Sequence, residues 1–216
     1  MVIPAFAVGR AQTMLLQLGR LKQARRIPDI PVYLNSPMAV NATALYVKHA
    51  SWHRLSRAEV HTMCSVATVI NSPEESRRLN QMKGPMIIVS ASGMATGGRV
   101  LHHLKQFAPD ARNMILFAGY QAGGTRGAAM VGGAESVKIH GEYVPVRAEV
   151  ALIDTLSAHA DYSEIITWLR NFKVAPKQTF LVHGEPAATD ALRQHISEQL
   201  AWRVNVPDYL DTVSLD

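Results

Sequence analysis

The sequence of 216 residues has a single cysteine and no long run of apolar residues. One cysteine, Cys64, excludes a disulfide within the chain and a Cys-x-x-Cys metal site, and it is most simply a buried thiol in a reducing compartment. The longest apolar runs, such as residues 86–89, are far too short to cross a bilayer. The first residues show neither a basic segment nor a small-residue cleavage site, so no secretory signal is visible. These absences predict a cytoplasmic protein that makes no use of a membrane.

Acidic side chains are missing from residues 10–26, a segment that has five basic ones. Such a stripe could receive the phosphates of a nucleic acid, although a solvated helix face is the plainer interpretation. In the whole chain, 48% of residues are hydrophobic and 18% are charged, which is typical of a soluble globular protein with a substantial core. The five basic residues of the stripe are Arg10, Arg20, Lys22, Arg25 and Arg26.

Strands and helices alternate in the first part of the sequence. Four times, a short apolar run is followed by a loop of small residues and then by a helical pattern with a 3.6-residue period. This alternation predicts a parallel sheet with helices on both faces, in which ligands gather at the carboxyl ends of the strands. The predicted strands are 2–7, 32–34, 86–89 and 114–117, and the helices that follow them are 10–23, 38–49, 99–107 and 125–131.

The pattern changes after Gly132. Two strands, 136–141 and 143–153, are predicted around a tight turn at Gly141-Glu142. They precede a βαβα piece that is too small to be a full domain, and residues 50–80 form a helical insertion with a charged surface. The predicted elements of the βαβα piece are a helix at 162–172, a strand at 179–182, a helix at 188–200 and one or two short strands within 204–213.

Two of the nine histidines directly follow predicted strands. If the helix between His159 and His183 is a βαβ crossover, both imidazoles arrive at the same edge of neighbouring parallel strands. Such a pair suits metal ligation or proton transfer, and Asp161 and Glu185 are close enough in sequence to orient the rings. The alternative is a pair of unrelated surface histidines.

A loop rich in glycine and hydroxyl groups occupies residues 90–98 and leads into a helix. Backbone amides at a helix start are a natural seat for phosphate, which makes Ser90, Ser92, Gly93 and Arg99 candidates for substrate binding. The loop lacks the GKS/T of a P-loop and the G-x-G-x-x-G spacing of dinucleotide sites. A tight turn packed against the sheet is an equally good interpretation.

Together these segments resemble the β-CASP branch of the metallo-β-lactamase superfamily, which includes the cleavage and polyadenylation endonuclease and the J-type ribonucleases. The motifs occur in the order of the family over most of the chain, so the resemblance is specific. They are IPAFAVGRAQ at residues 3–12, SPMA at 36–39, SGMATGGR at 92–99, SAHAD at 157–161 and LVHGE at 181–185.

The resemblance implies an α/β fold in two parts. A parallel, doubly wound β-CASP domain would occupy residues 1–153, and the C-terminal βαβα part of a metallo-β-lactamase αββα sandwich would occupy residues 154–216. The implied activity is that of a zinc-dependent RNA phosphodiesterase. His183 would then bind one of two zinc ions, and His159 would face the scissile phosphate and protonate the leaving group. Arg10 and the loop at 90–98 would seat the RNA backbone.

The sequence also departs from the family. The HxHxDH motif, a further ligand histidine, the bridging aspartate and the motif A acid precede the β-CASP segment in the family, and none is present here. A catalytic zinc site usually needs about three protein ligands. We therefore expect that the N-terminal half is missing and that the isolated chain holds no zinc and is inactive. It would expose an apolar seam, which a symmetric homodimer would bury.

Two other functions stay open at this point. The chain could be a non-catalytic homologue that binds RNA or a protein partner. It could also be a nucleotide or phosphosugar enzyme with a doubly wound sheet, although no nucleotide fingerprint is found.

Overall fold

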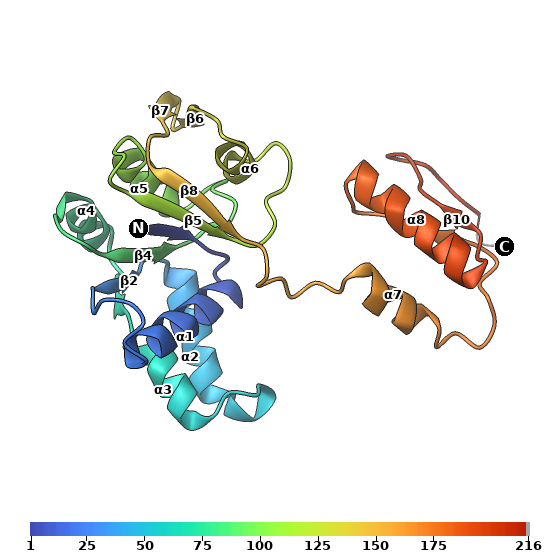
Figure 1. Ribbon diagram of the computed structural model, residues 1–216, viewed down its shortest axis with the longest axis horizontal. Coiled ribbons are helices and arrows are strands. Elements are labelled where there is room, and N and C mark those ends of the chain that lie inside the picture. Colours follow the sequence, from blue (N-terminus) through green and yellow to red (C-terminus); the bar gives the residue numbers. More distant parts are fainter. Residues whose placement is uncertain (215–216) are drawn as a thin grey trace. The chain divides into compact units, whose positions relative to one another are not determined.

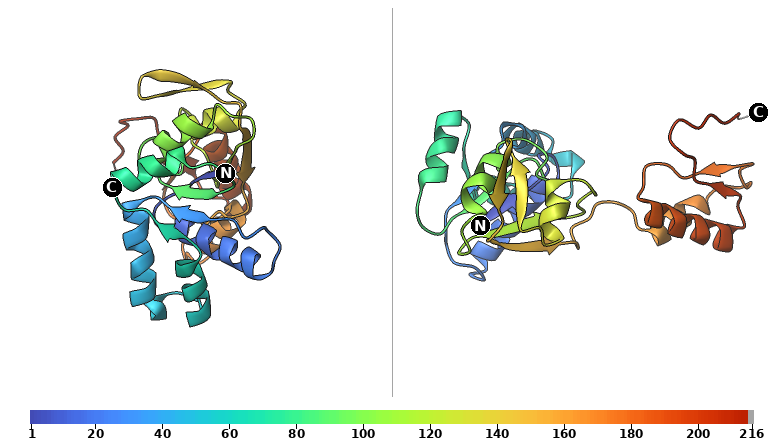
Figure 2. Two further views of the ribbon diagram at one scale, coloured as in Figure 1. Left: turned by 90° about the vertical axis from the view of Figure 1, so that its left-hand side faces the viewer. Right: turned by 90° about the horizontal axis from the view of Figure 1, so that it is seen from above.

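The computed structural model describes residues 1–214, and the chain divides into two compact units, Met1–Ser157 and Ala158–Asp216. The first unit contains a large sheet between helices, and the second contains two helices and a two-stranded sheet. Figures 1 and 2 show the elements of each unit. Among the helices of the described residues, none has the length and apolar character that a membrane span requires.

The sheet of the first unit has six strands, and each strand is parallel to its neighbours. Their order is β3-β2-β4-β1-β5-β8, so β1 lies between β4 and β5. All six carboxyl ends therefore meet at one edge. The strands are β1 (Val2–Pro4), β2 (Val32–Leu34), β3 (Thr68–Val69), β4 (Ile87–Ser90), β5 (Met114–Ala118) and β8 (Glu149–Ile153).

Helices cover both faces of this sheet (Figure 1), because side chains alternate between the two faces along each strand. Ile3 packs in one apolar cluster with Leu15 of α1, whereas its neighbour Val2 packs in another with Phe117. The predicted doubly wound parallel α/β fold is confirmed. One face holds α1 (Arg10–Gln23), α2 (Pro37–Lys48) and α3 (Arg57–Ser65), and the other holds α4 (Pro73–Gln81), α5 (Val100–Phe107) and α6 (Arg126–Val131).

The predicted strand at 143–153 is wrong, because two separate strands occupy it. β7 (Glu142–Pro145) forms an antiparallel hairpin with β6 (Ser136–Ile139), and β8 joins the large sheet beside β5. The extended strand is interrupted between β7 and β8, where the amides of Arg147 and Ala148 both donate to the carbonyl of Ala108. The hairpin turn also lies one residue earlier than predicted, since His140 and Gly141 have φ of 49° and 86°.

The insertion at residues 50–80 is less helical than predicted. A short 3-10 helix, η1 (Ala50–Trp52), precedes α3, and the two-residue strand β3 extends the sheet beside β2. Cys64 of α3 is exposed, in contrast to the predicted buried thiol. Its partial burial raises the pKa of the thiol, which keeps it protonated and weakly nucleophilic at neutral pH.

The second unit is a small βαβ arrangement with one more helix. It consists of α7 (Tyr162–Leu169), β9 (Thr179–Phe180), α8 (Pro186–Leu200) and β10 (Val204–Asn205), with β9 and β10 parallel. Its buried apolar core contains Ile166, Leu169 and Ile196. So small a core stabilises a unit of this size only marginally.

The strands before His159 and His183 belong to separate sheets, one in each compact unit. The strand before His159 is β8, which pairs along its whole length with β5. The strand before His183 is β9, which pairs with β10. The partner of β8 lies earlier in the chain and the partner of β9 lies later, so the strand–helix–strand pattern alone does not specify the pairing.

Candidate functional site

The carboxyl edge of the six-stranded sheet collects the loops that the sequence analysis singled out. The helix after β1 covers one face of the sheet, whereas the helices after its neighbours β4 and β5 cover the other. The connections that leave β1 and its two neighbours therefore run to opposite faces of the sheet. Sheets of this kind bind ligands at such points, outside the carboxyl ends of the strands. The candidate site is the edge around β1.

The loop after β1 is held by Gln12, which is buried in the first turn of α1. Its side-chain oxygen accepts a hydrogen bond from the amide of Gly9 at 2.7 Å, and its Nε2 donates to the carbonyl of Ala7 at 3.1 Å. Gly9 has φ of 80°, a conformation that glycine adopts without strain. The Gly-Arg-Ala-Gln stretch thus fixes the turn that places Arg10 at the sheet edge.

Arg10 joins three of the loops at this edge. It begins α1 after β1, and its Nη1 donates to the carbonyl of Leu156 in the loop after β8. Its Nη2 lies above Gly119, the residue after β5, where a β-carbon would come within 3.3 Å of it. Arg10 is half-buried, so its guanidinium positions the loops and only part of it faces solvent.

The two serines of the loop at 90–98 serve its internal structure. Ser90 is 1% exposed, and its hydroxyl donates to the carbonyl of Asn35 at 2.8 Å, which ties the ends of β4 and β2 together. It therefore does not belong to a substrate surface, contrary to the prediction. The half-buried Ser92 accepts hydrogen bonds from the amides of Thr96 at 3.0 Å and Gly97 at 3.3 Å, and so closes the loop.

Gly93 is buried beneath an aromatic ring that the sequence analysis missed. A β-carbon at Gly93 would come within 2.8 Å of Cδ2 of Phe6, so the glycine makes room for that ring. Phe6 follows β1 and is 44% exposed, and Tyr120 follows the neighbouring β5 and is 58% exposed. Phe6 was assigned to the first strand, which ends two residues earlier at Pro4.

Arg99 is also engaged inside the fold. Its Nη1 donates to Oδ1 of Asn35 at 2.9 Å, and its Nη2 donates to the carbonyl of Asn71 at 2.7 Å. Arg99 therefore holds the loops after β2 and β3 together. These hydrogen bonds engage its guanidinium within the fold, where the sequence predicted a contact with substrate.

A buried histidine completes this polar network. Nδ2 of Asn35 lies 2.7 Å from Nε2 of His103, whose Nδ1 lies 2.5 Å from Oδ1 of Asn80. Because the amide nitrogen donates, the ring is neutral and carries its proton on Nδ1. Burial, assisted by the charges of His102 and Arg99, lowers the pKa of His103 to about 4.

The basic stripe at residues 10–26 does not form one open surface. Arg20 pairs with Glu59, and Lys22 pairs with Asp29 at 2.6 Å. Arg25 and Arg26 are exposed beyond the end of α1. A solvated helix face therefore describes α1 better than a single phosphate-binding stripe.

A shallow hollow of about 360 Å³ lies beside the loop at 90–98. Thr96, Arg126 and Lys138 line it together with Thr125. Arg126 is engaged with the carbonyls of Ala95 and Thr96, whereas the side chain of Lys138 is exposed and lies 5.9 Å from the ring centre of Tyr143. This hollow offers an exposed cation, Lys138, and the hydroxyls of Thr96 and Thr125.

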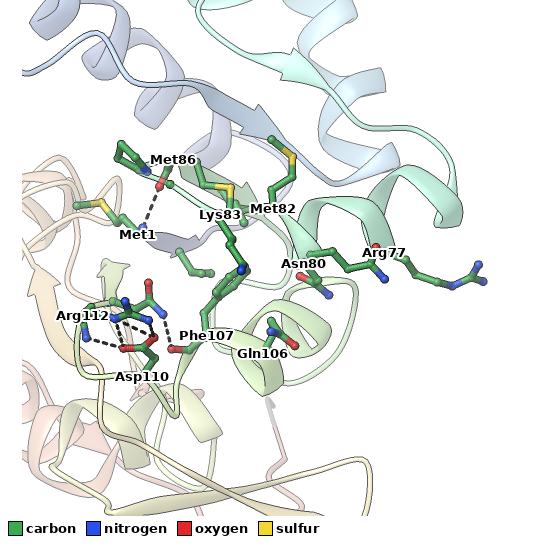
Figure 3. A pocket seen from close by; sticks show the side chains of 16 residues that line it. Met1, Arg77, Asn80, Met82, Lys83, Met86, Gln106, Phe107, Asp110 and Arg112 are labelled. Carbon is green, nitrogen blue, oxygen red and sulfur yellow. Dashed lines mark hydrogen bonds and ion pairs between the residues drawn. The ribbon is translucent and has the colours of Figure 1, made fainter.

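Another cavity of about 940 Å³ opens at the opposite, amino edge of the sheet (Figure 3). One of its basic side chains already has an ion-pair partner, since Arg112 pairs with Asp110 at 2.7 Å. None of the residues that the sequence analysis singled out lines this cavity, so the candidate site stays at the carboxyl edge.

In the second unit, His159 is exposed in the loop before α7. Asp161, two residues later, caps that helix: its Oδ1 accepts hydrogen bonds from the amides of Ser163 at 2.8 Å and Glu164 at 2.9 Å. The hydroxyl of Ser163 and these amides hold the pKa of Asp161 below its usual value. The carboxylate thus starts the helix that follows His159.

His183 is exposed between β9 and α8 and has φ of 63°, which is uncommon for a residue with a side chain. Glycine at the next position, 184, leaves room for Thr189, since a β-carbon there would come within 2.6 Å of Cγ2 of that side chain. Glu185 precedes α8, and its carbonyl accepts from the amide of Thr189 at 2.9 Å. Strained backbone of this kind is found at functional sites.

A metal site cannot be completed from these donors. Within residues 1–214, no three His, Cys, Asp or Glu side chains lie close enough together to hold a metal ion. A catalytic zinc site usually needs about three protein ligands, and His183 does not have two further ones beside it among these residues.

Residues 11–130 match the family model of the Beta-Casp domain. The chain belongs to this family. Residues 143–207 match a second model, described as a Zn-dependent metallo-hydrolase RNA specificity domain. The resemblance inferred from the motifs is thereby confirmed for the β-CASP branch of the metallo-β-lactamase superfamily.

Several curated proteins are similar to this chain. Ribonuclease TTHA0252 of Thermus thermophilus is 37% identical over 85% of the chain and 43% of its own length. The RNase J-like protein of Methanocaldococcus jannaschii is 34% identical over 85% of the chain and 42% of its own length. Transcription termination factor FttA of Methanosarcina mazei is 30% identical over 99% of the chain and 35% of its own length. The chain thus spans less than half of these relatives, and the family includes RNA-processing nucleases.

Proposed function

We propose that this chain supplies the RNA-clamping part of a metal-dependent ribonuclease. The observation on which the proposal rests is the arrangement of side chains at the carboxyl edge of the sheet. Its motif residues form an internal scaffold, and the loops on that scaffold expose two aromatic rings, Phe6 and Tyr120. The exposed cation of Lys138 lines the hollow beside the loop at 90–98. The Beta-Casp match and the names of the relatives support RNA as the ligand.

RNA would bind this edge without regard to its sequence. Bases stack on exposed aromatic rings whatever their identity, and cations attract the backbone. Phe6 and Tyr120 follow neighbouring strands of the sheet, β1 and β5, so a single strand of RNA could stack on both. Lys138, the hydroxyl of Thr96 and the open part of Arg10 would receive phosphates.

The catalytic assignments concern the second unit. His159 would face the scissile phosphate and protonate the leaving oxygen as a general acid. His183 would be one zinc ligand, a role supported by its exposed and strained position. Two zinc ions would activate the attacking water when bound. The remaining ligands would come from an N-terminal metallo-β-lactamase half outside this sequence.

The domain boundary is part of the same proposal. Residues 1–153 would be the β-CASP domain and 154–216 the returning part of the metallo-β-lactamase domain. The first compact unit ends slightly later, at Ser157, because Arg10 binds the carbonyl of Leu156. A protein of this kind with one exposed thiol and no disulfide would work in the reducing cytoplasm.

The partner surface would lie on the second unit, which exposes several large apolar side chains: Trp168, Val174, Val182, Tyr209 and Leu210. In the intact protein the N-terminal half would cover this surface. In the isolated chain a second copy would cover it, giving a symmetric homodimer. Sedimentation of Trp168→Glu against the unaltered chain tests this, since the charge should convert a dimer into a monomer.

Titration of the chain with an RNA oligomer at several salt concentrations tests the RNA interface. We expect weak, sequence-insensitive binding that salt reduces steeply. Phe6→Ala and Tyr120→Ala should each weaken it, and Lys138→Ala should reduce the salt slope by about one. Tight, salt-independent binding of a mononucleotide would instead favour a nucleotide or phosphosugar enzyme.

A non-catalytic homologue that binds RNA or a protein is the second candidate, since the retained His159 and His183 do not prove activity. Ribonuclease activity of a protein that joins this chain to its N-terminal half separates the two. A catalytic role predicts that His159→Ala and His183→Ala each abolish cleavage. A binding module would show no cleavage to abolish.

A further inference from the structure

Two helices of the first unit form an arm that projects from the sheet. Figure 2 shows α2 and α3 side by side, extending away from the strands. α2 begins directly after Ser36 at the carboxyl edge, and its 12 residues carry the chain about 18 Å away from that edge. The tip of the arm, defined here as residues 46–57, is therefore a separate surface.

The tip carries basic residues and no acidic ones. No acidic residue occurs between residues 30 and 58. Lys48, Arg54 and Arg57 are exposed there, and among residues 1–214 none of the three has an ion-pair partner. The three charges are therefore open to an external anion.

The nearest acid on the arm is already engaged. Glu59 accepts a hydrogen bond from the amide of Ser56 at 2.8 Å and pairs with Arg20. The Ser56 amide above all, together with Arg20, lowers the pKa of Glu59 to about 2. Its carboxylate thus caps α3 and offsets a cation of α1, and the charge of the tip stays positive.

An aromatic ring stands at the centre of the tip. Trp52 is 84% exposed, and its ring lies 5.2 Å from that of His49. On the same tip, Tyr46 and His53 stack with ring centres 5.4 Å apart. Burial of a tryptophan side chain is strongly favourable. Because Trp52 is not buried in the fold, a ligand that covers its ring would gain this free energy on binding.

The tip is also held in one shape. Nδ1 of His53 accepts from the amide of Leu55 at 3.2 Å, and its Nε2 donates to the carbonyl of Tyr46 at 2.8 Å. The amide of Trp52 donates to the carbonyl of His49 at 3.0 Å. A platform that is rigid before binding loses less entropy when a ligand arrives.

We propose that the tip of this arm is a second binding site for single-stranded RNA. A base stacks on Trp52, and Lys48, Arg54 and Arg57 receive the flanking phosphates. This pairing of a stacking ring with unpaired cations is the chemistry of single-strand binding, and the absence of acids favours an anion over a protein surface of mixed charge. The inference rests on the proposed RNA-binding function and extends the path of the RNA beyond the sheet edge.

Fluorescence of Trp52 in the full chain reports directly on this contact. The chain has three tryptophans, so the double variant Trp168→Phe, Trp202→Phe leaves Trp52 as the only one. Titration with an oligo(U) RNA should quench its emission, and added salt should reverse the quenching. Far-ultraviolet circular dichroism establishes that the variant is folded. If it is not, the quenching lost in Trp52→Phe in the otherwise unaltered chain gives the same information.

Affinity for oligo(U), measured by anisotropy, gives an independent result. Trp52→Ala should weaken binding about five-fold or more, which corresponds to the stacking of one base. Lys48→Ala and Arg54→Ala should each lower the salt slope by about one. Met82→Ala is the control, because Met82 is a 44% exposed apolar side chain that lines the cavity at the opposite edge of the sheet. Its substitution should leave the affinity unchanged.

The other outcomes separate this inference from the proposed function. If Phe6→Ala and Tyr120→Ala weaken RNA binding while Trp52→Ala does not and Trp52 emission stays constant, the tip is not an RNA site and the edge still is. If the chain binds no RNA, both are wrong. If Trp52→Ala leaves RNA affinity intact but converts a dimer into a monomer, the tip is a protein contact and this inference is overturned.

Discussion

Phe6 and Gly93 lie against each other at the carboxyl edge of the sheet, although 87 positions separate them in the sequence. A β-carbon at residue 93 would approach Cδ2 of Phe6 to 2.8 Å and its backbone nitrogen to 2.9 Å. Both distances are shorter than any real contact of a β-carbon, so side chain and backbone would have to move. The glycine of the Ser-Gly-Met-Ala motif therefore sets the position of an aromatic ring on the loop after β1.

Gly93→Ala should consequently weaken both folding and RNA binding. Overpacking at a buried site costs about 1–3 kcal/mol of stability, and displacement of Phe6 should lower RNA affinity in the same variant. Urea unfolding and anisotropy measure the two effects. Gly97→Ala is the matched control in the same loop, because a β-carbon there meets nothing within 4 Å. Equal losses in the two variants would contradict the role given to Phe6.

A second prediction concerns Asn35, which is fully buried. It accepts from Arg99 and donates toward Ser76 and His103. Asn35→Leu keeps the volume but leaves these polar groups without a partner. An unsatisfied buried polar group costs about 1–3 kcal/mol, so the free energy of unfolding should fall by about 3 kcal/mol. Asn41→Leu on the exposed face of α2 should change it by less than about 0.5 kcal/mol.

The network around Asn35 also shows what the sequence could and could not predict. α1 was predicted with its observed bounds, because its apolar period and its Gly-Arg-Ala-Gln start are local signals. The inward orientation of Ser90 and Arg99 depends on acceptors far away in the chain. Ser90 donates to a residue 55 positions earlier, and Arg99 to residues 28 and 64 positions earlier. No local pattern reveals that a motif side chain has such a partner.

The sheet that each of the strands before His159 and His183 joins could not be predicted from the sequence for a similar reason. A strand, a helix and a strand in sequence favour a crossover between neighbouring strands, but they do not determine which strands pair. β8 pairs with β5 as the last strand of the six-stranded sheet, whereas β9 pairs with β10. The positive φ of His183 could not be predicted either, since it is a backbone torsion that no residue type in this loop requires.

A third prediction follows from His103. Its pKa is lowered to about 4 in the folded protein from an ordinary value of 6.5. Between these values the unfolded chain binds a proton that the folded protein excludes. The free energy of unfolding therefore decreases as the pH falls from about 6.5 to about 4, by up to about 3 kcal/mol. Chemical unfolding at pH 7 and at pH 4.5 measures the difference.

His103→Gln should lose this part of the pH dependence, because glutamine does not titrate. His61→Gln is the control, since His61 is an exposed histidine of α3. Glu59 and Asp110 are exposed, and the stability that their lowered pKa values provide is lost mainly below their ordinary pKa values of 4.5 and 3.8, so they add little to the difference between pH 7 and pH 4.5. An unchanged pH dependence in His103→Gln would show that the buried ring is not the responsible group.

The last prediction concerns metal. The isolated chain should bind no stoichiometric zinc and should cleave no RNA. His183 supplies one donor, and within residues 1–214 no three potential ligands come together. A single imidazole competes poorly with water for zinc, and neighbours that orient a ligand cannot replace missing ligands. Metal analysis after dialysis against zinc, with a ribonuclease assay on extensively purified protein, measures both. His183→Ala should give the same zinc content as the unaltered chain. One tightly held zinc per chain, lost together with activity in His183→Ala, would mean that these residues form a complete enzyme and that the proposed division of the site is wrong.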